Sequence, residues 1–300
     1  MGINSKKILA ALVLGAALIA AGVSCQKKVE TKVEDTGPKV DSVASADGVM
    51  IHYDVRGAGD RALVFVHCWS CDRSYWDGQT DEFAKNYKVV TLDLAGHGES
   101  GMGREVWSMP AYGADVAAVV NKLQLKDVVL IGHSMGGAVC LEAARLLPGT
   151  VTAIVGVDTY QDLTQTMQPQ QMEQMVAPFR QNFAATTEAF VKSICGPNAD
   201  SSLANRIAKD MASESPEVGI GSFEQLFVYD PAATLKEVRV PIRCINADLF
   251  PTNVEGNKSV AASFEVKYMP GHGHFLHLED PAGFNALLHE TLAEFQPEQH

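Results

Sequence analysis

Short runs of apolar, often β-branched residues alternate along this chain with stretches in which apolar residues recur at helical spacing. In one such stretch Tyr112, Val116 and Val120 fall on a single helical face, and Leu288 and Leu292 do so near the C-terminus. This alternation is typical of strands in a mostly parallel sheet that has helices on both faces. The sequence therefore predicts an α/β fold, with strands at 50–55, 62–66, 88–92, 127–132, 152–157, 242–246 and 264–269.

Residues 160–238 interrupt this alternation, because they contain no clear strand pattern and are rich in Gln, Ala and Met. Methionines at helical spacing, such as Met172 and Met175, belong to a packed core more often than to a ligand-binding surface. In a segment that covers a cleft, however, some of them would line the substrate pocket. We expect residues 160–238 to form a helical cap inserted after the strand at 152–157.

The N-terminus has a different composition. Lys6 and Lys7 precede an apolar stretch at 8–23, which has signal-peptide length rather than the roughly 20 residues that span a bilayer. Small residues then lead to Cys25, which resembles the processing site of bacterial lipoproteins, although Gly22 stands where that site usually has Leu. We expect a signal peptide and lipid attachment at Cys25; a plain signal peptide or an uncleaved anchor is the alternative.

The residues after Cys25 are charged, lack aromatic side chains and show no periodic apolar face. This composition is typical of a flexible linker. We therefore expect three parts: a signal peptide at 1–24, a lipid-anchored tether at 25–41 and one domain at 42–298. Such a protein would be exported and held on a membrane of the bacterial cell envelope, on the periplasmic or outer-membrane side.

Composition limits the partners of this domain. Hydrophobic residues make up 46% of the 300 residues, which is enough for a sizeable core in a single domain. The formal net charge is -12, and it becomes -14 without Lys6 and Lys7. So acidic a chain argues against nucleic acid or anionic lipid as the main partner, because both are bound through Lys and Arg clusters.

The strongest chemical signal is the segment Gly132-His133-Ser134-Met135-Gly136, which follows an apolar strand and opens a helix rich in Ala and Leu. A G-x-S-x-G sequence between a strand and a helix is the nucleophile elbow of serine hydrolases. The two glycines are needed because the serine sits on a strained turn, where a side chain at either position would collide with the backbone. We predict that Ser134 is a nucleophile.

Four stretches in this order resemble the α/β-hydrolase family: 64–69 its oxyanion-hole loop, 93–100 its D-x-x-G-x-G-x-S loop, 132–137 its elbow and 273–275 its histidine loop. The resemblance extends from about 47 to 295. It implies an α/β-hydrolase fold with an inserted cap, and a serine hydrolase that needs no metal or organic cofactor. The substrate class it implies is a small ester-like molecule.

A serine hydroxyl needs a base within hydrogen-bond reach. His274 follows the strand at 264–269, where the resemblance places the family's histidine, and His272 and His277 are near competitors. These three histidines could also suggest a metal site, but no Cys, Asp or Glu partner has a matching spacing.

The base needs a carboxylate to orient it. Our choice is Asp248, which follows the strand at 242–246 and precedes a proline. Asp158, at the end of the strand at 152–157, is the alternative, because some relatives place the acid there. Chain order alone does not separate the two aspartates sharply.

Two backbone N–H groups are needed to stabilise the oxyanion. Met135 supplies one, and the resemblance gives Trp69 as the other, with Cys68 standing where the family has glycine. Cys68 and Cys71 form a C-x-x-C that could also indicate a thioredoxin-like redox site, a local disulfide or two packed thiols. His97 is expected to be structural.

We expect the reaction to be cleavage of a carboxylic ester, lactone or thioester through an acyl-enzyme on Ser134. Cofactor-free haloperoxidase or lyase-like chemistry on the same residues is one alternative. The other is a ligand-binding envelope lipoprotein without catalysis, because Cys68 alters the oxyanion loop.

Overall fold

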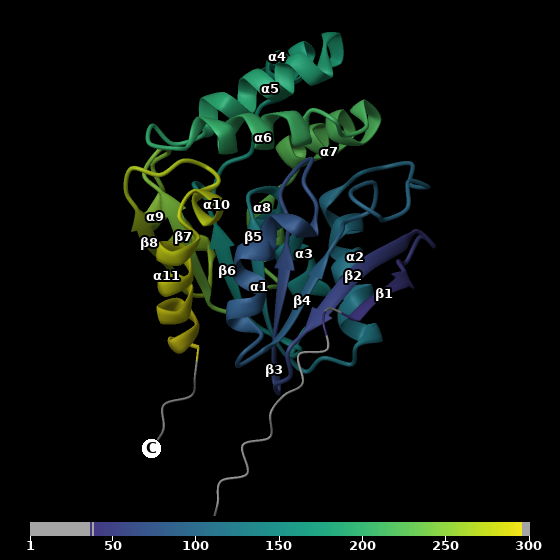
Figure 1. Cartoon of the computed structure of the whole chain (residues 1–300), viewed down its shortest axis with the longest axis vertical. Helices are drawn as coiled ribbons and strands as arrows, with labels where there is room; N and C mark the ends of the chain where they lie inside the picture. Colours follow the sequence, from purple (N-terminus) through teal and green to yellow (C-terminus); the bar gives the residue numbers. More distant parts are fainter. Residues whose placement is uncertain (1–36, 38, 296–300) are drawn as a thin grey trace, which may run out of the picture. The chain divides into compact units, whose positions relative to one another are not determined.

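The computed structural model describes residue 37 and residues 39–295. Within them the chain forms one eight-stranded sheet in the order β1-β2-β4-β3-β5-β6-β7-β8 (Figure 1). The first two strands are antiparallel to their neighbours and all later pairs are parallel. The strands are β1 (Lys39–Ala44), β2 (Met50–Arg56), β3 (Arg61–Val66), β4 (Lys88–Leu92), β5 (Asp127–His133), β6 (Val151–Val157), β7 (Ile242–Ala247) and β8 (Phe264–Met269).

Every predicted strand is present, and β1 is additional. It begins at Lys39, within the segment 25–41 that was expected to be a tether, so the ordered domain starts earlier than predicted. The predicted signal peptide and lipid attachment at Cys25 lie outside the described residues. Among residues 39–295, no helix combines the length and the apolar character needed to cross a bilayer.

Side chains of the central strands alternate between two cores, because successive residues of a strand point to opposite faces. Leu63 and Phe65 belong to the core beneath α1 and α11, whereas Val64 and Val66 belong to the core beneath α2 and α3. The predicted mostly parallel sheet with helices on both faces is confirmed. The helices outside the cap are η1 (Arg73–Trp76), α1 (Asp77–Phe83), α2 (Met109–Lys122), α3 (Met135–Leu146), α8 (Pro231–Leu235), α9 (Val254–Val260), α10 (Leu276–Glu279) and α11 (Pro281–Ala293).

Residues 160–238, all of which are described, contain helices and no strand. Figure 1 shows four of these helices together beyond the carboxyl ends of the parallel strands. That end of an open α/β sheet is where ligands bind, in the crevice outside the strand ends. The cap helices are α4 (Pro169–Gln181), α5 (Phe183–Ile194), α6 (Ser201–Met211) and α7 (Pro216–Val228).

Candidate active site

The turn between β5 and α3 holds Ser134 in a strained backbone conformation, with φ of 53° and ψ of -116°. A Cβ atom on Gly132 would lie 2.4 Å from the Gly136 carbonyl oxygen, and one on Gly136 would lie 2.5 Å from the Val66 carbonyl oxygen. Both glycines are therefore required sterically, for the reason that the sequence suggested. The strain lifts the serine out at the start of α3, and such outliers are typical of functional sites.

His274 lies in the loop after β8, and its side chain is 14% exposed. Its backbone N–H donates to the Ile194 carbonyl oxygen at 2.8 Å, so the cap helix α5 holds this loop. The Nδ1 atom is 2.5 Å from Oδ2 of Asp158. A carboxylate at Nδ1 fixes the tautomer that leaves Nε2 free to accept a proton.

Asp158 follows the last residue of β6 and has φ of 42°. Its other carboxylate oxygen accepts a hydrogen bond from the Ala247 N–H at 2.9 Å. The side chain is 1% exposed, so both oxygens are held away from solvent by defined donors. This is the arrangement that orients a histidine base and stabilises it when it is protonated.

The structure corrects the predicted acid. Asp248 is exposed, and its carboxylate accepts a hydrogen bond from the Gly271 N–H at 2.9 Å instead of contacting His274. The backbone turn at Asp158, which points that side chain across the end of β7, is the physical reason that the earlier aspartate reaches the imidazole.

Neighbouring polar side chains hold the Asp158 loop, and the sequence analysis missed them. Asn246, fully buried at the end of β7, donates to the Thr159 carbonyl oxygen at 3.1 Å and accepts from the Thr159 N–H at 3.3 Å. Tyr160 donates its hydroxyl to the Gly137 carbonyl oxygen at 2.6 Å. The only available signal was an asparagine at the end of an apolar strand, because a buried amide needs partners.

The backbone N–H groups of Trp69 and Met135 make no hydrogen bond with any other residue in the described part of the chain. Met135 is the first residue of α3, where N–H groups lack an intrahelical acceptor. The Trp69 ring is fixed by a 2.6 Å hydrogen bond from its Nε1 to the Gly219 carbonyl oxygen in α7. Both N–H groups are thus available to an oxyanion.

The other histidines near Ser134 are not placed to act as bases. Burial lowers the pKa of His133 well below its usual value and that of His277 to about 3, so both are neutral at pH 7. His133 makes a 2.8 Å hydrogen bond through Nε2 with the His274 carbonyl oxygen. His97 is buried, and burial likewise lowers its pKa to about 3, in agreement with a structural role.

The alternatives of a metal site and a redox fold can be compared with the same geometry. Within residues 39–295, no three His, Cys, Asp or Glu side chains converge as a metal site would require. His272 contacts the Pro270 carbonyl oxygen, whereas His277 packs on Trp76. The thioredoxin-like alternative for Cys68 and Cys71 is wrong, because the fold is that of an α/β hydrolase.

Two cavities meet at Ser134 and His274, which line both. The larger, of about 580 Å³, has many polar groups in its wall, including Gln161, Asp162 and Gln165. The smaller, of about 230 Å³, is apolar. Its distinctive lining comes from the oxyanion loop and the cap: Cys68, Trp69, Met175, Phe190, Ile194, Met211 and Phe223.

The family model described as Alpha/beta hydrolase family matches residues 63–287. The karrikin insensitive 2 receptor CA of Petunia hybrida is 22% identical over 242 residues, covering 76% of this chain and 90% of the receptor. A non-heme haloperoxidase of Rhodococcus erythropolis is 41% identical over 104 residues, covering 34% of this chain and 36% of that protein. The solved structure of an esterase from Exiguobacterium antarcticum superposes with a TM-score of 0.76 at 18% identity, over 85% of this chain and 100% of the esterase. At that identity the structural likeness concerns the fold.

Proposed function

The chain belongs to the alpha/beta hydrolase family, and on this premise we propose that it is a serine hydrolase that cleaves an ester-like substrate through an acyl-enzyme on Ser134. The observation that carries the proposal is the contact of His274 with Asp158 beside a serine held on a strained elbow. Ser134 and His274 also line the same two cavities, so both face the space that a substrate would occupy.

In this mechanism Ser134 attacks the substrate carbonyl carbon while Nε2 of His274 takes the hydroxyl proton. Asp158 keeps Nδ1 protonated and stabilises the imidazolium that forms. The N–H groups of Trp69 and Met135 stabilise the oxyanion, an interaction whose loss costs about 10²- to 10³-fold in rate per donor. His274 then gives its proton to the leaving group, and water, activated by the same imidazole, releases the acid.

No hydrogen bond joins the Ser134 hydroxyl to the His274 ring within residues 39–295. Catalytic hydrogen bonds are often long without substrate and tighten when it binds. The proposal therefore expects the serine hydroxyl to turn towards Nε2 when the cavities are filled.

We expect Ser134→Ala to lose ester hydrolysis by at least about 10³-fold, because the remaining groups can bind and polarise the substrate but not form the acyl-enzyme. The measurement is kcat/KM on p-nitrophenyl butyrate, together with labelling by a fluorophosphonate probe. The variant should keep its melting temperature and lose the label. Full activity in the variant would refute the nucleophile, and an unlabelled but folded wild type would favour a ligand-binding protein.

The two cavities support a substrate with an apolar acyl group and a more polar leaving group. Trp69 contributes both an oxyanion N–H in this proposal and part of the wall of the 230 Å³ cavity. An acyl chain attached to the polarised carbonyl would therefore extend into that apolar cavity. The larger cavity, with Gln165 in its wall, would take the alcohol or thiol portion.

The chain-length preference tests this assignment of the cavities. Phe190 lines the apolar cavity and is half-buried, so Phe190→Ala should enlarge the cavity with a moderate cost in stability. We expect the preference among p-nitrophenyl acetate, butyrate, hexanoate and octanoate to move to longer chains in this variant. Gln165→Ala, in the larger cavity, is the matched control and should leave the acyl preference unchanged; a shift in the control alone would reverse the assignment.

Haloperoxidase chemistry is the second candidate, supported by the 41% identity to the Rhodococcus erythropolis haloperoxidase over 104 residues. It would use the same serine and histidine. Peroxide-dependent halogenation that exceeds ester hydrolysis under matched conditions would favour it over the hydrolase.

A further inference from the structure

Cys68 and Cys71 lie on one tight turn between β3 and η1, with their sulfur atoms 3.0 Å apart. The Cys71 N–H donates to the Cys68 carbonyl oxygen at 3.3 Å, and Ser70 has φ of 52°, so the backbone itself brings the two side chains together. Both thiols are buried and reduced. No other pair of sulfur atoms is in contact in the part of the chain that the structure describes, although it holds three more cysteines: Cys140, Cys195 and Cys244.

Only one of the two thiols faces the substrate. Cys68 lines the 230 Å³ apolar cavity together with Ser134 and His274, so a small reagent that enters the cavity meets this sulfur first. Cys71 lies behind it and lines neither cavity. Burial raises the pKa of the Cys71 thiol well above its usual value, so it stays protonated until a partner sulfur is activated beside it.

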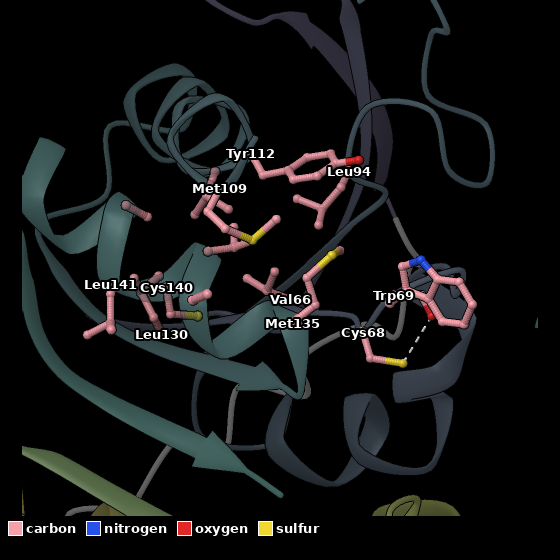
Figure 2. Close-up of a cluster of buried hydrophobic side chains, with 14 of the residues drawn as sticks. Val66, Cys68, Trp69, Leu94, Met109, Tyr112, Leu130, Met135, Cys140 and Leu141 are labelled. Carbon is pink, nitrogen blue, oxygen red and sulfur yellow. Dashed lines mark hydrogen bonds between the residues drawn. The ribbon is translucent and has the colours of Figure 1, made fainter. Parts of the chain in front are cut away.

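The turn is continuous with the oxyanion loop. Cys68 precedes Trp69, and Figure 2 shows the Cys68 thiol directed to the Trp69 carbonyl oxygen, to which it donates at 3.4 Å. The cap fixes both sides of the turn, because the Trp69 ring donates to Gly219 and the Tyr75 hydroxyl donates to Asp210 at 2.6 Å. A change between these anchors therefore falls on the backbone that carries the Trp69 N–H.

We propose that Cys68 and Cys71 are a reversible disulfide-forming site that controls the oxyanion loop. A small disulfide reacts with the Cys68 thiolate to give a mixed disulfide and one released thiol. The Cys71 sulfur then attacks the Cys68 sulfur, loses its proton and releases the second thiol. The two cysteines lose two electrons and two protons, and the small disulfide is reduced to two thiols.

The effect on activity rests on the proposed hydrolase function. Bond formation draws the two sulfur atoms about 1 Å closer together than they are as thiols. Part of that movement passes to the Trp69 N–H, and misplacing a catalytic group by about 1 Å can cost as much as about 10²-fold. Oxidation should therefore lower kcat by at least about 10-fold, and dithiothreitol should restore it.

The test treats the folded full-length protein with hydroxyethyl disulfide and then reads the bond and the activity separately. Peptide mapping after alkylation should show Cys68 linked to Cys71, with two fewer free thiols per chain, and kcat on p-nitrophenyl butyrate should fall. Cys71→Ser should instead carry a mercaptoethanol adduct on Cys68. Cys195→Ser, which alters a half-buried cysteine elsewhere, should respond to oxidation and reduction as the wild type does.

Two results would overturn the proposal. One is that both cysteines remain alkylated as free thiols after treatment; the other is that the link forms while kcat stays unchanged. If the reduced protein hydrolyses no ester, the proposed function fails, whereas the mapping still decides whether the disulfide site exists.

Discussion

Asp158 is held at its post by the backbone as much as by its partners. A positive φ of 42° is uncommon for a residue other than glycine, and it persists here because the N–H donates to Ile245 and the carboxylate accepts from Ala247. Asparagine tolerates the same backbone conformation, so a substitution at this position can remove the charge without removing the turn.

We expect Asp158→Asn to lower kcat by about 10⁴-fold, because an amide that donates to Nδ1 favours the wrong imidazole tautomer. Asp248→Asn is the control, since that carboxylate bonds to the Gly271 N–H and should change kcat by less than about 10-fold. Steady-state kinetics on one ester, with melting temperatures for both proteins, decides between them. A severe loss in Asp248→Asn with a mild one in Asp158→Asn would return the acid to β7.

The two aspartates also show what the sequence can and cannot predict about the site. Ser134 and His274 were found because each depends on local sequence: a glycine-flanked turn for the nucleophile and a loop after the last strand for the base. Asp158 and Asp248 both follow parallel strands and end at the same edge of the sheet, so local sequence treats them alike. The choice depends on one backbone dihedral and on the Ala247 N–H, which only the assembled sheet supplies.

At the scale of elements, the apolar strands were predictable and the edge strand was not. β1 has a polar, largely exposed sequence, KVDSVA, and it pairs with β2 alone, so no buried face gives it an alternating pattern. Tertiary bonds secure its end: the Ser45 hydroxyl donates to the Asp115 carboxylate of α2 at 2.5 Å. Arg104 bonds to the same carboxylate, and the Ala95 N–H donates to it at 3.1 Å.

We expect Asp115→Asn to lower the free energy of unfolding by about 3 kcal/mol or more, because it leaves the buried Arg104 guanidinium without its buried counter-charge. Asp81→Asn removes one partner of an exposed pair with Arg56, 2.7 Å apart, and should cost less than about 1 kcal/mol. Urea unfolding of both variants gives the comparison. Equal losses would mean that the cluster around Asp115 contributes no more than a surface ion pair.

At the scale of the whole molecule, buried ionisable groups tie stability to pH. Burial lowers the pKa of His97 and His277 to about 3, so the unfolded chain binds protons below about pH 6.5 that the folded chain refuses. Each of these histidines makes stability fall as the pH falls from about 6.5 to 3. Burial raises the pKa of Glu214 to about 7, so this carboxyl acts in the opposite direction, with stability lost as the pH rises from about 4.5 to 7.

Two substitutions with opposite signs test this balance. Neither ring nitrogen of His277 has a hydrogen-bond partner within residues 39–295, and the ring packs on Trp76, so His277→Phe keeps an aromatic ring and removes the titration. We expect this variant to lose about 1 kcal/mol less stability than the wild type between pH 6 and pH 5. Glu214→Gln should lose about 1 kcal/mol more over the same interval, because the proton that stabilised the folded state is no longer bound. Urea unfolding at pH 6.0, 5.5 and 5.0 measures the slopes, and parallel slopes in all three proteins would mean that these buried groups do not set the acid stability of the fold.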